Sequence, residues 1–165
     1  MSYQPYPTGG GSNQMAERPP APPSIQTAIK FMYAGAALSA VSLIVGLATI
    51  GSLKSAIKSA DPSYTASQIH AAEVVGVSTV VIFGLLGIGL WIWMARMNGA
   101  GKPWARVVAS VLFGISTLEL LLGGVRANSV FNLLFEGLVW LIGLGAIIFL
   151  YRRDSSEYFN ASRVR

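Results

Sequence analysis

The sequence of 165 residues contains no cysteine and a single histidine, His70. The absence of cysteine excludes disulfide bonds, thiolate metal sites and cysteine nucleophiles. One histidine is too few for a histidine-rich metal site. We therefore expect no metal site and no cofactor.

Charged residues are also scarce. They make up 12% of the chain, and 53% of its residues are hydrophobic, whereas a soluble domain carries about 25% charged residues. A hydrocarbon core of about 30 Å is crossed by about 20 apolar residues in a helix. Four apolar blocks reach that length, so the sequence predicts an all-α membrane protein, a single bundle of four transmembrane helices.

The apolar blocks place the spans at about 31–53, 74–95, 104–123 and 130–150, within a membrane bundle of residues 29–152. Residues 1–28 are rich in proline, glycine and serine and have no early apolar core, so we expect a disordered tail and no cleavable signal peptide. Residues 153–165 are polar and are expected to form a second tail. Thr65 and Gln68 have the spacing of a capping box that starts the second membrane helix, and Asp61-Pro62 should end the helix before it.

Lysine and arginine are distributed unequally between the two sides of this topology. One side holds nine of them: Arg18, Lys30, Arg96, Lys102, Arg106, Arg152, Arg153, Arg163 and Arg165. The other side holds Lys54, Lys58 and Arg126. The positive-inside rule then predicts that both termini are cytoplasmic (N-in, C-in) in a multi-pass protein of the plasma membrane.

The excess of these 12 lysines and arginines over 7 acidic residues gives the chain a net charge of +5 and a pI of about 9.8. Since they flank membrane spans, we expect contact with anionic lipids at the cytoplasmic face and no nucleic-acid partner. Trp91, Trp93, Trp104 and Tyr151 fall at the same boundary and are expected to form an aromatic belt.

Small residues mark the faces on which the helices should pack, because lipid supplies no hydrophobic drive between helices. The first span presents Gly35, Ser39, Ser42, Gly46 and Thr49 on one face; the second presents Gly76, Gly84 and Gly87, and the third Ser110, Gly114 and Thr117. We expect these faces to pack within the bundle, with a homodimer interface as the alternative.

Two acidic residues, Glu119 and Glu136, fall inside the third and fourth spans. Ionisable groups in a membrane are costly and are candidates for function. Both glutamates flank one short turn that contains Arg126, and Asn132 shares a helical face with Glu136. These four residues form the candidate polar cluster.

Three interpretations of this cluster follow. Two nearby carboxylates would hold a proton, a cation or a small ligand. Alternatively, the cluster is a structural staple in which Arg126 pairs with a glutamate. In the third interpretation both carboxylates face water. His70 and Glu73, at the outer mouth of the second span, are expected to be solvated.

The chain contains no hydrolase, metalloprotease, dinucleotide or kinase motif, so we expect no enzymatic activity. The small size and the small-residue faces favour an accessory or interaction subunit of a membrane complex, whose partner would be a larger membrane protein or further copies of the chain. The alternative is a small transporter or ion-conducting oligomer that uses Glu119 and Glu136.

Three stretches together resemble a known group: FMYAGAALSAVSLIVGLATIGSLKSAI, GIGLWIWMARMNGAGKPWARVVASVLFGISTL and YRRDSSEYF. They are similar to uncharacterised, small four-helix integral membrane proteins of actinobacteria. The resemblance covers most of residues 24–159. It implies the four-span topology and supplies no catalytic or binding residues.

Overall fold

The computed structural model describes residues 20–124 and 130–162, and these ranges are helical apart from short connections. The helices are α1 (Pro23–Ala48), α2 (Ile50–Ala60), α3 (Ala66–Gly99), α4 (Pro103–Gly124), α5 (Val130–Leu150) and α6 (Arg153–Ala161). Within these residues, four helices (α1, α3, α4 and α5) are long and apolar enough to cross a membrane. The predictions of an all-α fold and of four helices with the length and hydropathy of membrane spans are confirmed for these residues.

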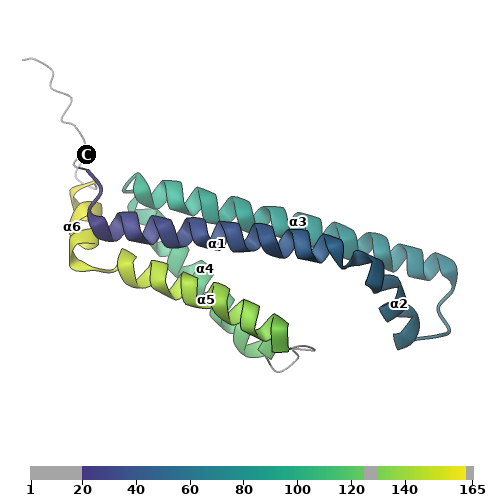
Figure 1. Ribbon diagram of the computed structural model, residues 1–165. Coiled ribbons are helices and arrows are strands. Elements are labelled where there is room, and N and C mark those ends of the chain that lie inside the picture. Colours follow the sequence, from purple (N-terminus) through teal and green to yellow (C-terminus); the bar gives the residue numbers. More distant parts are fainter. Residues whose placement is uncertain (1–19, 125–129, 163–165) are drawn as a thin grey trace, which may run out of the picture.

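The helices form two hairpins that share one end (Figure 1). α1 and α3 make a long hairpin, and α4 and α5 make a second one that contacts the first mainly through α1 and α5. α6 lies across the shared end, beside the start of α1 (Figure 1). We call this the α6 end and the opposite end of the long hairpin the α2 end.

α1 begins earlier than the sequence suggested. Residues 23–28, assigned above to the tail, form its first turns, and Ser24, Ile25 and Ala28 are buried. Pro23 is the first residue of the helix, a position where the missing N–H costs nothing. Ile25, Ala28 and Met32 then continue on one face at helical spacing, which explains why the helix starts eight residues before the first long apolar run.

The first membrane helix also ends earlier, at Ala48, and α2 follows with a change of direction (Figure 1). The Thr49 hydroxyl donates to the carbonyl oxygens of Val45 at 3.0 Å and Gly46 at 3.1 Å, and the Ser52 hydroxyl donates to Thr49 at 2.6 Å. Such side-chain bonds to the preceding turn compete with the helical ladder and bend helices.

The connection from α2 to α3 was predicted correctly. α2 ends at Ala60, and Asp61 has extended backbone angles, as expected before Pro62. At the start of α3, the Thr65 N–H donates to Oε1 of Gln68 at 2.8 Å, and the Gln68 N–H donates to the Thr65 hydroxyl at 3.4 Å. This is the predicted capping box.

α3 has 34 residues, a length of about 51 Å at 1.5 Å per residue. Because this exceeds a hydrocarbon core of about 30 Å, its first turns extend beyond the apolar segment. Gln68, His70 and Glu73 lie on these turns.

The turn between α3 and α4 has a Schellman geometry. The Lys102 N–H donates to the Met97 carbonyl at 3.2 Å, and the Gly101 N–H donates to the Asn98 carbonyl at 3.0 Å. Gly101 has a φ of 67°, a left-handed conformation that glycine adopts without strain. A Cβ at this position would also lie 2.9 Å from the ring of Tyr158, so the turn requires glycine for two reasons.

The C-terminal segment expected to be a polar tail is partly a packed helix. In α6, Ser155 and Phe159 are buried, with exposed fractions of 0% and 2%. The Ser155 hydroxyl lies 2.6 Å from the Ser24 hydroxyl, and the Tyr158 hydroxyl donates to the Gly99 carbonyl at 3.0 Å. α6 therefore ties the start of α1 to the end of α3.

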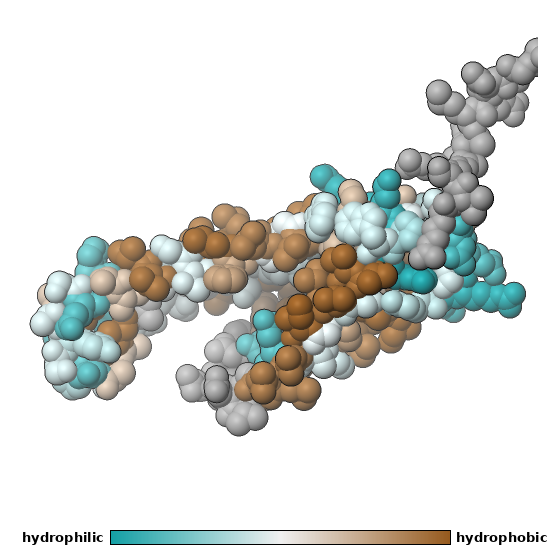
Figure 2. All heavy atoms as spheres, turned by 180° about the vertical axis from the view of Figure 1, so that it is seen from behind, coloured by the Kyte–Doolittle hydropathy of each residue, from teal (hydrophilic) through white to brown (hydrophobic). Residues whose placement is uncertain are grey.

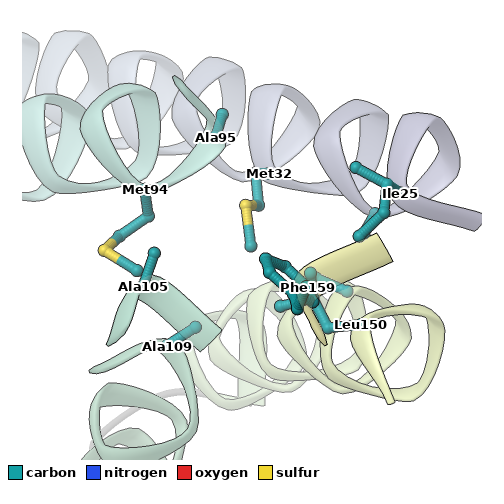
Figure 3. Close-up of a cluster of buried hydrophobic side chains, with 10 residues drawn as sticks. Ile25, Met32, Met94, Ala95, Ala105, Ala109, Leu150 and Phe159 are labelled. Carbon is teal, nitrogen blue, oxygen red and sulfur yellow. The ribbon is translucent and has the colours of Figure 1, made fainter. Parts of the chain in front are cut away.

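The hydrophobic core lies at the α6 end (Figure 3). It contains Ile25, Ala28, Met32, Met94, Ala95, Ala105, Ala109, Ala146, Leu150 and Phe159. Further away from α6 the two hairpins diverge, with a hollow between them (Figures 1 and 2). The described bundle is therefore closed over one half of its length and open over the other.

The expectation that the small-residue faces pack within the bundle holds for Gly35, Gly46 and Gly84. Ser42 and Thr49 are exposed, and a Cβ at Gly87 or Gly114 would meet no described atom within 4 Å. A Cβ at Gly35 would lie 2.7 Å from the indole of Trp91, and one at Gly46 would lie 3.0 Å from Val80. In the reverse direction, a Cβ at Gly84 of α3 would lie 2.8 Å from Leu43. These close approaches show that glycines allow α1 and α3 to pack closely along the long hairpin.

Candidate functional site

A cavity of about 290 Å³ lies beside the core, between α3, α4 and α5. Met32, Met94, Ala109 and Ala146 belong both to the core and to the cavity wall. The remaining lining residues are Gly87, Leu90, Trp91, Leu112, Phe113, Ser116, Glu119, Val139, Trp140, Gly143 and Ile147. The cavity thus begins where the closed half of the bundle ends.

Three aromatic side chains, Trp91, Phe113 and Trp140, form much of the wall. The rings of Phe113 and Trp140 are tilted against each other, with centroids 5.5 Å apart. The Trp140 N–H donates to the Thr117 hydroxyl at 2.9 Å, and that hydroxyl donates to the Phe113 carbonyl at 2.8 Å. With its polar atom bonded to α4, Trp140 is held in place and adds apolar ring surface to the cavity.

Two glycines seat these rings. Trp91 lies directly over Gly35 of α1, and Phe113 lies over Gly143 of α5, where a Cβ would be 3.1 Å from its ring. Either glycine, replaced by a larger residue, would push an aromatic ring out of its present position. The shape of the cavity therefore also depends on Gly35, which is not part of its lining.

Glu119 is the member of the predicted polar cluster that lines the cavity. It lies sixteen residues after Pro103, the first residue of α4, or about 24 Å along the helix. Ser116, one turn earlier on the same face, also lines the cavity. Both are therefore within the length of helix that spans a hydrocarbon core.

The other members of the cluster are placed differently. Glu136, which is exposed like Glu119, does not line the cavity, although Trp140 and Gly143, which share its helical face, do. Arg126 and the side chain of Asn132 lie outside the described residues. The structure therefore brings one of the four residues, Glu119, to the cavity. The cluster as a whole stays a prediction.

The lining of this cavity combines a large apolar surface with few polar groups. Among the described residues, no group of three or more His, Asp or Glu side chains could hold a metal ion. The carboxylate of Glu119 and the hydroxyl of Ser116 are the oxygen-bearing side chains of an otherwise apolar and aromatic lining. Apolar walls with few polar groups are typical of sites for small organic ligands.

A second hollow, of about 340 Å³, lies at the α2 end and is lined by Lys54, Lys58, Tyr64, Ala66, Ile69, His70 and Glu73. His70 Nδ1 and a carboxylate oxygen of Glu73 are 4.0 Å apart, and His70 is largely exposed. Ile69 of α3 is buried, and α2 packs against α3. This polar hollow is separate from the cavity and holds neither Glu119 nor Glu136.

The aromatic wall was missed by the sequence analysis. Trp93 and Trp104 are exposed, with centroids 5.4 Å apart, as suits a belt at the membrane boundary. Trp91, expected to belong to that belt, instead packs on Gly35 and faces the cavity. The spacing of two between Trp91 and Trp93 carried the signal, because residues two apart point to different faces of a helix.

No family model, no curated protein and no solved structure matches the chain.

Proposed function

We propose that the protein is a non-enzymatic, multi-pass protein of the plasma membrane that acts as an accessory or interaction subunit of a membrane complex. The observation that supports this proposal is the divergence of the two hairpins beyond the shared core (Figure 1). Helices that do not pack against each other within the chain leave faces for the helices of a partner, which is a larger membrane protein or a further copy.

The α4–α5 hairpin offers such faces. A Cβ added at Gly114 or Gly137 would meet no atom of the described chain within 4 Å, in contrast to Gly143 and Gly145 on α5. Val111 and Leu118, one turn to either side of Gly114, are exposed. A glycine surrounded by large apolar residues on a membrane-facing surface allows a partner helix to approach closely.

The proposed orientation is N-in, C-in. Lys30, Lys102 and Arg106 lie near the α6 end, Arg152 lies between α5 and α6, and Arg153 is the first residue of α6. The guanidinium of Arg106 lies 4.6 Å from the ring centroid of Tyr151 and donates to the Ser156 hydroxyl at 3.0 Å. Held at the edge of the bundle, these cations suit contact with anionic lipids of the cytoplasmic leaflet.

Purification in mild detergent tests the accessory function. We expect a membrane protein to co-purify at fixed stoichiometry with the full chain, and Gly114→Leu to lose it. Gly89→Leu is the matched control, because Gly89 is also open to its surroundings but lies on the other hairpin. A chain that purifies alone, or a partner lost equally from both variants, would contradict the proposal.

A second candidate function is transport of a cation or proton by a small oligomer that uses Glu119 and Glu136. The position of Glu119 in the cavity wall favours it. Purified protein in liposomes would then move protons or cations, and Glu119→Gln would abolish the movement. Transport that survives both Glu119→Gln and Glu136→Gln would exclude this function.

A further inference from the structure

We propose that the cavity between α3, α4 and α5 binds a lipophilic organic cation, whose charge is neutralised by Glu119 and whose apolar surface contacts the aromatic wall. This inference deepens the second candidate function, on which it rests in part, because it names the class of ligand. It does not require that the ligand is transported.

Charge complementarity is the first argument. Glu119 is the ionisable side chain in the lining of the cavity. Glu119 is exposed within the described chain, so the low dielectric around it is that of the bilayer that α4 is proposed to cross, where a carboxylate is stabilised by a positive partner more than in water. An anionic ligand would face repulsion there, and a neutral one would not compensate the charge of the carboxylate.

The lining also decides what kind of cation fits. Ca²⁺ and Mg²⁺ bind about six or more oxygen ligands, of which proteins supply several as carboxylates, whereas Glu119 and Ser116 are the side chains of this lining that carry oxygen. The remaining lining residues are glycine, alanine, methionine, aliphatic and aromatic residues. A cation that carries its own apolar groups matches both parts of the cavity.

The aromatic residues add a specific attraction. Trp91, Phe113 and Trp140 surround the cavity, and the faces of such rings attract cations, with tryptophan the strongest. Because Trp140 is bonded to Thr117 and Trp91 is seated on Gly35, these two rings are already positioned before a ligand arrives. A preorganised wall lowers the ordering cost of binding.

The direct test is equilibrium binding of tetraphenylphosphonium to the full chain in lipid nanodiscs, with empty nanodiscs as the background. We expect saturable binding that Glu119→Gln weakens by about tenfold or more. Glu157→Gln is the matched control, since it removes an exposed carboxylate of α6 that lies outside the cavity, and we expect its affinity to stay within about twofold of the wild type. Equal losses in the two variants would overturn the proposal.

A second pair of variants tests the cavity without changing a charge. Gly87 lines the cavity, and a Cβ there would meet no described atom within 4 Å, so Gly87→Leu places a side chain in the space. Gly89→Leu adds the same group outside the lining. Binding lost in Gly87→Leu and kept in Gly89→Leu supports the proposal, and binding kept in both overturns it. This pair decides the matter if Glu119→Gln fails to fold.

Tetraphenylborate, measured in separate samples, distinguishes a cation site from an apolar one, because it has the same shape and the opposite charge. We expect no saturable binding of the borate. Equal affinity for both ions would show an apolar cavity that takes lipid chains and would overturn the proposal. Saturable phosphonium binding without movement across liposomes would leave the site standing and remove only the transport function.

Discussion

Single glycines decide where the aromatic side chains of this protein lie. Gly35 is the strongest case, because its missing Cβ leaves the space that Trp91 fills. Gly35 does not line the cavity itself, but it contacts the Trp91 ring that does. Trp91 could not occupy its place in the wall if α1 carried any larger residue at this position.

Gly35→Ala should therefore destabilise the protein. The new Cβ would lie 2.7 Å from two indole atoms of Trp91, and overpacking of this kind costs about 1–3 kcal/mol. Gly89→Ala is the control, because a Cβ there meets no described atom within 4 Å and alanine favours a helix by about 1 kcal/mol. Thermal melting in detergent should show a lower Tm for Gly35→Ala alone. Equal Tm values would show that Trp91 does not depend on Gly35.

The hydrogen bond between Trp140 and Thr117 is a second prediction at this scale. Thr117→Val keeps the shape of the side chain but leaves the Trp140 N–H without its acceptor at 2.9 Å. Polar contacts between membrane helices contribute about 0.6–2 kcal/mol, so the melting temperature should fall by a few degrees. Thr117→Ser, which keeps the hydroxyl, should restore most of the loss. A Val variant as stable as the wild type would contradict this role for the bond.

At the scale of helices, the sequence predicted features that depend on neighbours in the chain. The capping box of Thr65 and Gln68 was found because its two bonds join residues three apart. The bend at Thr49 was not found, because a threonine that bonds back to Val45 looks the same in the sequence as one on a straight helix. The same holds for the cavity. Glu119 could be predicted because it is a charged residue in an apolar span, whereas the position of Trp91 could not, because it depends on contact with Gly35 of another helix.

α6 was missed for a related reason. Its composition is polar, and only Ser155 and Phe159, four residues apart, form its buried face. This face is too short to stand out from a polar tail. Its packing also depends on the early start of α1 at Pro23, since Ser24 is the partner of Ser155.

Phe159→Ala tests whether α6 is part of the folded unit. Phe159 is 2% exposed and belongs to the core, and truncation of a buried phenylalanine costs about 3–5 kcal/mol. Glu157→Ala on the same helix should change stability little, because its contact with Arg153 is an exposed ion pair. Melting in detergent compares the two. If Phe159→Ala melts like Glu157→Ala, α6 is not held by this residue.

At the scale of the whole molecule, the best-packed end of the bundle is also the end that carries most of the described positive charge. The core, α6 and the cations at positions 30, 102, 106, 152 and 153 lie at the same end of the bundle. The opposite half is open, and its cavity begins inside the membrane segment. In the proposed orientation, the closed end faces the cytoplasm and the diverging hairpins face the outer half of the bilayer, where a ligand or partner helix would enter from the lipid.

The orientation can be tested cleanly because the chain has no native cysteine. Ser59 on α2 and Glu157 on α6 are both exposed, so single cysteines at these positions should fold normally and be reachable by reagents. The topology predicted from the sequence assigns nine of the twelve lysines and arginines to one side, and the positive-inside rule predicts that this side, which includes α6, is cytoplasmic. An impermeant thiol reagent should therefore label Ser59→Cys in intact cells and label Glu157→Cys only after the membrane is permeabilised. Labelling of Glu157→Cys in intact cells, with Ser59→Cys protected, would invert the topology and move the opening between the hairpins to the cytoplasmic leaflet.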